Sequence, residues 1–107
     1  MKNTALSYED RLILQKANPD WQLNEDTTAL SVRYQFTNFR RAFAFMTEVG
    51  MMAEKYDHHP EWFNVYGRVE LKMTTHDHQG LSALDAKMVP LISAAAMRHE
   101  AKIVKAD

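Results

Sequence analysis

The sequence predicts a two-layer α+β fold in which a four-stranded antiparallel sheet is covered on one face by three helices. Four short segments have the alternation or the composition of strands, and they form two pairs joined by short turns, as antiparallel neighbours do. Three other segments repeat apolar residues every three or four positions, which is typical of helices that bury one face. The predicted order is α-β-β-α-β-β-α, and helices with one apolar face each can pack side by side on the sheet.

The first helix and the first strand pair lie at the N-terminal end. Ser7 followed by Asp10 is a helix N-cap pattern, and it opens the helix that we expect over residues 8–17. Residues 21–23 are a short strand candidate. Residues 29–36 alternate between apolar and polar side chains, which predicts a half-buried antiparallel strand.

The longest amphipathic segment follows. Pro60 cannot continue a helix, so this helix ends by about Asp57 and leaves His58 and His59 just beyond its C-terminus. We expect its apolar stripe to pack on the sheet. The stripe consists of Phe39, Ala42, Phe43, Met46, Val49, Met52, Ala53 and Tyr56.

A hairpin and a final helix complete the chain. Strands are expected over residues 62–66 and 69–74, on either side of a tight turn at Gly67-Arg68. Ser82 and Asp85 repeat the N-cap pattern at the start of the last helix. The residues expected to face inward are Val69, Leu71 and Met73 in the hairpin, and Leu84, Met88, Leu91, Ile92 and Ala95 in the helix.

The composition describes one ordinary globular domain over residues 1–107. Apolar residues make up 46% and charged residues 25% of the chain, which disfavours disorder. The formal net charge is −1, so a nucleic-acid partner is not expected. The absence of Cys excludes disulfides, thiolate nucleophiles and Cys-based zinc sites. We see neither a signal-peptide core nor an apolar run of membrane-spanning length, and therefore expect a cytoplasmic protein without a membrane partner.

Four of the five histidines lie close to the predicted hairpin. His58 and His59 precede its first strand, and His76 and His78 follow its second. Because hairpin strands are antiparallel, the start of one lies beside the end of the other, so these imidazoles should meet at one rim of the sheet. Imidazole exchanges protons near neutral pH, and an indole offers a flat face to a ring-shaped ligand. The residues expected to join the histidines there are Glu54, Asp57, Trp62, Thr75 and Asp77.

Two other interpretations of these residues stay open at this point. A loop histidine such as His78 or His99 is more often solvated than functional, and a Trp alone is more often core than ligand platform. A metal site is the second interpretation, because His76 and His78 would share one face of an extended segment and the His58-His59 pair could complete a three-histidine set. Against it, adjacent histidines point apart, and the spacing matches no established ligand pattern.

One sequence motif identifies the type of site more specifically than the residue types alone do. The stretch HHPEWFNVY at residues 58–66 is followed by a strand, by TTH at 74–76, and by GLS at 80–82 with Asp85 four residues after Leu81. In this register, and in its element order from the strand at Trp21 to the last helix, the chain resembles the pterin-4a-carbinolamine dehydratases.

The resemblance implies an enzyme that dehydrates 4a-hydroxytetrahydropterin to the quinonoid dihydropterin, recycling the cofactor of aromatic amino acid hydroxylases. It implies that His58, His59 and His76 are the catalytic histidines. Loss of water from C4a needs a general acid, and loss of a proton from a ring nitrogen needs a general base. We expect His58 and His76 to transfer protons and His59 to contact the substrate, with no metal and no organic cofactor. The expected substrate-binding residues, of which Glu54 and Asp85 could orient the histidines, are Glu54, Asp57, Trp62, Thr75 and Asp85.

The resemblance also implies partners. Family members form homodimers or homotetramers, which would cover the open strand edges of a small sheet, and an aromatic amino acid hydroxylase would act in the same pathway. Animal members also act as dimerisation cofactors of a homeodomain transcription factor, so a non-catalytic binding module is the alternative function. The three converging imidazoles favour catalysis, because a pure interaction module has no need of them.

Overall fold

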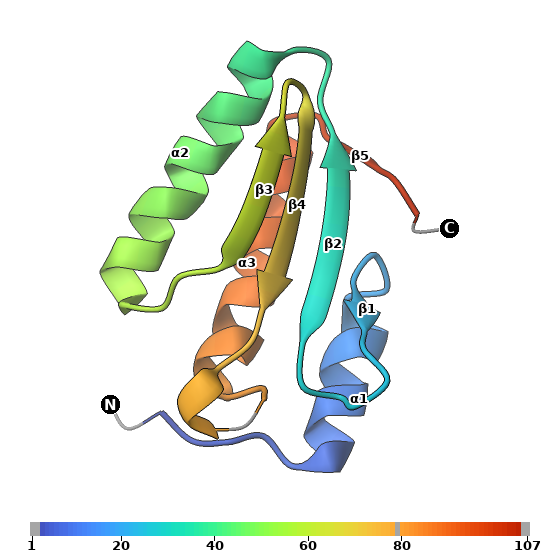
Figure 1. The fold of residues 1–107 in the computed structure, drawn as a ribbon, viewed down its shortest axis with the longest axis vertical. Coiled ribbons are helices and arrows are strands. Elements are labelled where there is room, and N and C mark those ends of the chain that lie inside the picture. Colours follow the sequence, from blue (N-terminus) through green and yellow to red (C-terminus); the bar gives the residue numbers. More distant parts are fainter. Residues whose placement is uncertain (1–2, 79, 106–107) are drawn as a thin grey trace.

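The chain forms one antiparallel sheet backed by helices (Figure 1). The computed structural model describes residues 3–78 and 80–105. Its elements are, in order, α1 Tyr8–Ala17, β1 Gln22–Leu23, β2 Leu30–Gln35, α2 Phe39–Tyr56, β3 Glu61–Val65, β4 Arg68–Met73, a 3-10 turn His76–His78, α3 Ala83–Arg98 and β5 Lys102–Ile103.

The strand order is β1-β2-β4-β3, and every pairing is antiparallel. β1 and β5 share one edge of β2, with β1 beside Ser31 and β5 beside Gln35. The predicted fold class and element order are confirmed, with β5 and the 3-10 turn added. β5 was missed because it has two residues and no alternation to detect. It follows Glu100, whose left-handed backbone (φ 60°) lies between α3 and this strand.

The predicted helix ends are confirmed because local capping interactions set them. The Ser7 hydroxyl accepts a hydrogen bond from the Asp10 N–H at 3.1 Å, and the Asn38 side chain accepts one from the Arg41 N–H at 2.9 Å. Such bonds satisfy backbone donors that have no partner inside the helix. None of the helices in the described part of the chain has the length and apolar character needed to cross a bilayer.

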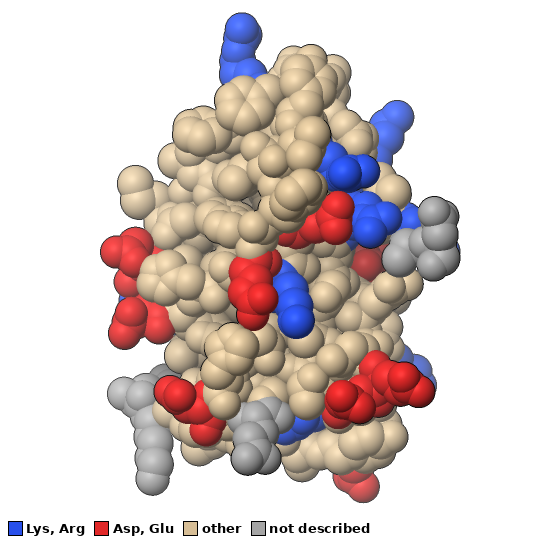
Figure 2. All heavy atoms as spheres, in the orientation of Figure 1, with Lys and Arg blue, Asp and Glu red and all other residues tan. Residues whose placement is uncertain are grey.

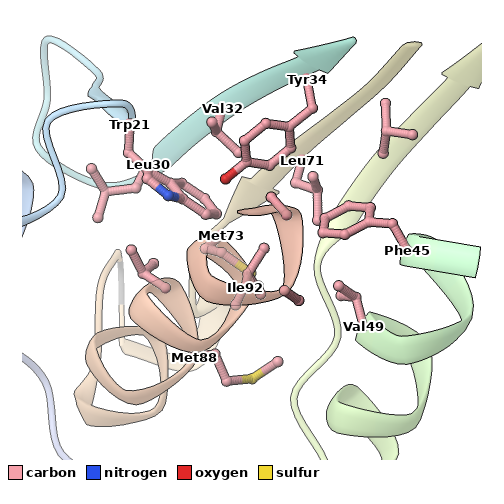
Figure 3. Packing of buried hydrophobic residues seen from close by; sticks show 14 of the residues in the cluster. Trp21, Leu30, Val32, Tyr34, Phe45, Val49, Leu71, Met73, Met88 and Ile92 are labelled. Carbon is pink, nitrogen blue, oxygen red and sulfur yellow. The ribbon is translucent and has the colours of Figure 1, made fainter. Parts of the chain in front are cut away.

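One face of the sheet carries the core, against which α2 and α3 pack (Figure 3). The Tyr34 and Phe45 rings meet edge to face, 5.5 Å apart. The Trp21 indole N–H donates to the Ser93 hydroxyl at 2.8 Å, so the largest buried side chain has its polar atom satisfied. Burial raises the pKa of the Tyr34 hydroxyl to about 12. The buried residues of β2 and β4 are Leu30, Val32, Tyr34, Val69, Leu71 and Met73.

The predicted apolar stripe of α2 is wrong in part. Phe39 and Phe43 are 45% and 56% exposed and stack on each other at 5.5 Å, whereas Phe45, which lay outside the predicted stripe, is fully buried. Phe43 and Phe45 lie on nearly opposite sides of the helix, and contact with the sheet selects the side that is buried. In α3, Leu91 is likewise exposed while Val89 is buried. The buried residues of α2 are Ala42, Phe45, Val49 and Ala53.

Candidate active site

The C-terminus of α2 places the first two histidines. Asp57 caps the helix in the left-handed conformation (φ 50°, ψ 46°), and the His58 N–H donates to the Ala53 carbonyl at 3.0 Å. This pattern closes many helices, and Asp tolerates the left-handed conformation better than most side chains. Pro60 is buried and leads directly into β3. His58 and His59 are therefore held at the junction between helix and strand.

His58 is bound to a buried carboxylate. Its Nε2 lies 2.6 Å from Oδ1 of Asp85, and the two side chains are 12% and 0% exposed. The other carboxylate oxygen accepts hydrogen bonds from the Ser82 N–H at 2.9 Å and from the Thr75 hydroxyl at 2.6 Å. Because an ionised carboxylate only accepts, the His58 Nε2 carries a proton, and Nδ1 is the ring nitrogen that can exchange one with a ligand.

Asp85 and Thr75 are interior groups. The Thr75 hydroxyl lies 2.7 Å from the Ser82 hydroxyl as well as bonding Asp85, and the described part of the chain has no buried side-chain nitrogen or oxygen without a partner. These atoms are committed to one another. The geometry therefore favours a role for Asp85 and Thr75 in orienting His58, and not in direct contact with a substrate.

The other two catalytic candidates have exposed carboxylate partners. Nε2 of His59 lies 2.6 Å from Oε2 of Glu54, and Nε2 of His76 lies 3.3 Å from Oε2 of Glu61. The two imidazole side chains are 56% and 84% exposed. Each of the three histidines thus has its own acidic partner on Nε2, and the pair formed by His58 is the one inside the protein.

The hairpin brings His58 and His76 to the same rim of the sheet. Thr75 directly precedes His76, and its hydroxyl oxygen lies 3.5 Å from Nε2 of His58. Glu61, at the first position of β3, meets His76 just beyond the end of β4. Glu61 was not among the residues predicted for the rim. The hairpin register could have found it, because Glu61 pairs with Lys72 near the end of β4.

The remaining predicted residues differ in position. Trp62 is partly exposed and lies near α2, since a Cβ built on Gly50 would be 3.9 Å from its Cη2 atom. Glu54, Asp57 and Asp77 are exposed. Trp62 and these carboxylates are therefore open to a ligand in a way that Asp85 is not.

The expectation that His78 and His99 are solvated is wrong. The His78 ring is half-buried, and its Nε2 donates to the Asn3 carbonyl at 3.0 Å. Nε2 of His99 lies 2.8 Å from Oε1 of Glu48, between α3 and α2. The hydrogen bond from His99, assisted by Arg98, lowers the pKa of the Glu48 carboxyl.

The geometry on which the metal interpretation depended is not found. Residues His76–His78 form a 3-10 turn instead of an extended segment, and their two imidazoles face different partners, Glu61 and Asn3. Across residues 3–78 and 80–105, no cluster of three or more His, Asp and Glu side chains is arranged to hold a metal ion.

A separate hollow of about 750 Å³ lies on the open face of the sheet. Arg33 and Glu70, 3.5 Å apart, form an ion pair within it. Figure 2 views this face and shows acidic and basic side chains gathered near its middle, below a largely uncharged surface. The three catalytic candidates do not line the hollow, which reaches the histidine rim at Glu61 and Trp62. The two surfaces are distinct and meet at the start of β3.

Comparisons with known proteins bear on this geometry. Residues 4–95 match the family described as pterin 4 alpha carbinolamine dehydratase. A protein of Rhizorhabdus wittichii, provisionally named pterin-4-alpha-carbinolamine dehydratase, is 47% identical over 91 residues, which cover 85% of this chain and 94% of the relative. A protein of Novosphingobium aromaticivorans with the same provisional name is 56% identical over 70 residues, 65% of this chain and 73% of the relative. A crystal structure of a transcriptional coactivator/pterin dehydratase from Brucella melitensis has a TM-score of 0.81 and 37% identity, covering 86% of this chain and 98% of that chain.

Proposed function

The chain belongs to the pterin-4a-carbinolamine dehydratase family, and from this premise we propose that it dehydrates 4a-hydroxytetrahydropterin to the quinonoid dihydropterin and water. The C4a–O bond breaks, the departing hydroxyl receives a proton, and a ring nitrogen gives one up. The reaction therefore needs a general acid and a general base, without net consumption of protons. The observation that supports it best is the set of three imidazoles at one rim, each bound to a carboxylate through Nε2.

His58 and His76 are the proposed proton-transfer groups. His58 is fixed by the buried Asp85 carboxylate, whereas His76 is exposed beside Glu61. Two imidazoles with such different surroundings can divide the roles of acid and base at neutral pH. No step in this scheme requires a metal or an organic cofactor.

Substrate contacts are assigned to the exposed members of the rim. His59, with Glu54 behind it, is proposed to bind the pterin, with Trp62 as a wall against the flat ring and Asp57 as a polar contact. Thr75 and Asp85 contribute to binding through His58, to which their network is bonded.

The test generates 4a-hydroxytetrahydropterin with a pterin-dependent hydroxylase and follows quinonoid product in the presence of this protein. Wild-type protein should accelerate the dehydration. His58→Ala and His76→Ala should each lower kcat by a factor of roughly 10²–10⁴, which is the usual contribution of one proton-transfer group to the rate. His99→Ala is the matched control, since it removes a histidine with a carboxylate partner outside the rim. Dehydration at the uncatalysed rate with folded wild-type protein would refute the proposal.

Self-association is proposed alongside catalysis. β3 has β4 as its partner on one edge and no other described strand on its second edge, and an open edge invites pairing with another copy. Phe39, Phe43 and Met51 also expose apolar surface along α2. A homodimer or homotetramer joined through these surfaces would bury them. Light scattering at micromolar concentration should give a multiple of the 12.4 kDa chain mass; a monomer would contradict this.

The second candidate function is that of a non-catalytic binding module. The Brucella melitensis relative is described as a transcriptional coactivator as well as a pterin dehydratase, and the exposed apolar residues of α2 offer a surface for a protein partner. An aromatic amino acid hydroxylase is the partner expected from the reaction. Retained capture of such a partner by variants that lack His58 and His76 would separate binding from catalysis.

A further inference from the structure

The half-buried His78 belongs to a contact that links the N-terminal residues to both halves of the histidine rim. Residues 3–6, here termed the N-terminal strap, run antiparallel to the start of α3, with Ala5 bridged to Ser82. N–H groups in the first turn of a helix have no partner within the helix. Two of those in α3 donate hydrogen bonds to oxygen atoms of the strap. The strap bonds are Ala83 N to Thr4 O at 2.8 Å, Leu84 N to Asn3 Oδ1 at 3.1 Å and Leu6 N to Leu81 O at 2.9 Å.

The turn that carries His76 is closed on itself by backbone bonds. Thr75 and Gly80 exchange two hydrogen bonds, of 2.5 and 3.1 Å, and the His78 N–H donates to the Thr75 carbonyl at 3.0 Å. The His76 side chain is 84% exposed, and its partner Glu61 is exposed as well. Contacts at the surface therefore hold His76 weakly, and the orientation of the turn decides where its imidazole lies.

The bond from His78 Nε2 to the Asn3 carbonyl joins this turn to the strap. The strap in turn caps α3, the helix that begins with Ala83 and carries Asp85 in its first turn. The turn bearing His76 and the helix bearing the partner of His58 are thereby bonded to one common segment.

We propose that His78 is a positioning residue of the active site, which fixes His76 relative to the His58–Asp85 pair by tying the catalytic turn to the N-terminal strap. A carbonyl oxygen only accepts, so His78 acts as an N–H donor, and neither its charge nor its second nitrogen is needed. A side chain that supplies an N–H at the same reach should replace it. The proposal rests on the proposed dehydratase function, because it concerns the placement of that function's histidines.

Arg11 fixes the other end of the same assembly. Its Nε donates to the Leu6 carbonyl at 3.1 Å and its Nη1 to the Thr27 carbonyl at 2.8 Å. The guanidinium also covers the end of the catalytic turn, since a Cβ built on Gly80 would lie 2.7 Å from Nη1. Gly80 has φ +140°, which side chains rarely adopt. The strap is thus held at both ends, so a bond to it can restrain the turn.

The test compares His78→Ala, His78→Phe and His78→Gln with the control His99→Ala, which removes a histidine hydrogen bond between α2 and α3. Ala and Phe lack the donor, Phe keeps a ring of similar size, and Gln restores an N–H. We expect Ala and Phe to lower kcat roughly tenfold with little change in KM, because misplacement of a reacting group slows chemistry without removing a substrate contact. His78→Gln should stay within about threefold of wild type, and His99→Ala should leave kcat unchanged.

Amide hydrogen exchange supplies a readout that does not depend on activity. Exchange at residues 76–78 and at Ala83 and Leu84 should accelerate in His78→Ala and His78→Phe, but not in His78→Gln or His99→Ala. Full activity in His78→Phe, or equal loss in His78→Gln and His78→Ala, would overturn the proposal. Unchanged exchange in His78→Ala and His78→Phe would overturn it too. A wild-type protein without dehydratase activity would instead refute the proposed function, while the exchange comparison would still decide whether the strap restrains the turn.

Discussion

Replacement of Asp85 by Asn probes the buried end of the site with the smallest change of shape. In the wild type the carboxylate is fully buried and accepts hydrogen bonds from Ser82, Thr75 and His58. An Asn side chain can keep the two bonds on one oxygen, but its NH₂ group then faces the N–H of His58. The substitution therefore leaves one donor facing another inside the protein, or forces the imidazole into its other tautomer.

Both consequences have a predictable size. A buried donor without an acceptor costs about 1–3 kcal/mol, so the free energy of unfolding should fall by about that amount. The tautomer change moves the proton from Nε2 to Nδ1, which alters the nitrogen available for exchange with the substrate. The corresponding Asp→Asn change beside a protease histidine lowers kcat about 10⁴-fold, and we expect a loss of roughly 10²–10⁴ here.

The assay combines urea denaturation with single-turnover dehydration, so that loss of fold and loss of chemistry are measured separately. Glu48→Gln is the matched control, because it alters a His–carboxylate pair that is remote from the rim. This control should keep its kcat. If folded Asp85→Asn protein retained kcat within about twofold of wild type, the assignment of Asp85 as the group that orients His58 would be wrong.

Three further predictions concern the core, the helix cap and the metal question. Burial raises the pKa of Tyr34 from an ordinary value of 10.0 to about 12. The contribution of the neutral Tyr34 hydroxyl to the free energy of unfolding should therefore be fully present below pH 10 and fall by about 2–3 kcal/mol as pH rises to 12. Urea titrations should show this fall in wild type and not in Tyr34→Phe. Asp57→Gly removes a side chain from a left-handed residue and should raise the free energy of unfolding by about 1 kcal/mol in urea denaturation, with a raised KM if the Asp57 carboxylate contacts the pterin. Purified protein should show no stoichiometric metal by elemental analysis, and chelator should leave its dehydration rate unchanged; one tightly bound metal per chain, lost together with activity, would overturn the proton-transfer scheme.

The element boundaries could be predicted because short-range chemistry decides them. Ser7 accepts a hydrogen bond from the Asp10 N–H, and Ser82 and Asp85 form a capping box. α2 closes at Asp57, whose left-handed backbone leads the chain out of the helix before Pro60. The buried face of α2 could not be predicted in the same way. Phe43 and Phe45 are both apolar and lie roughly 200° apart around the helix axis, and contact with the sheet, which no local pattern encodes, buries Phe45 and leaves Phe43 exposed.

The same distinction applies to the site. The convergence of the histidines at the rim follows from the antiparallel hairpin. Glu61 could have been included by the same reasoning, since it pairs with Lys72, four residues before His76. The hydrogen bond of His78 is different, because its partner Asn3 lies 75 positions away in the chain. A loop histidine beside such a partner looks solvated in the sequence, because the strap that buries it is placed by tertiary contacts.

The three histidine–carboxylate pairs of the rim are alike in composition and differ in burial, which gives them different physical behaviour. The exposed pairs of His59 and His76 lie in water, where salt screens the attraction and each pair contributes little to holding its ring. The His58 pair is shielded from such screening and is fixed by the hydrogen-bond network of Asp85. The proposed reaction would use one rigid reference from which protons move, together with groups that can adjust to an entering pterin. Folding supplies the reference at His58, and the position of the exposed His76 then depends on the backbone of the turn that carries it.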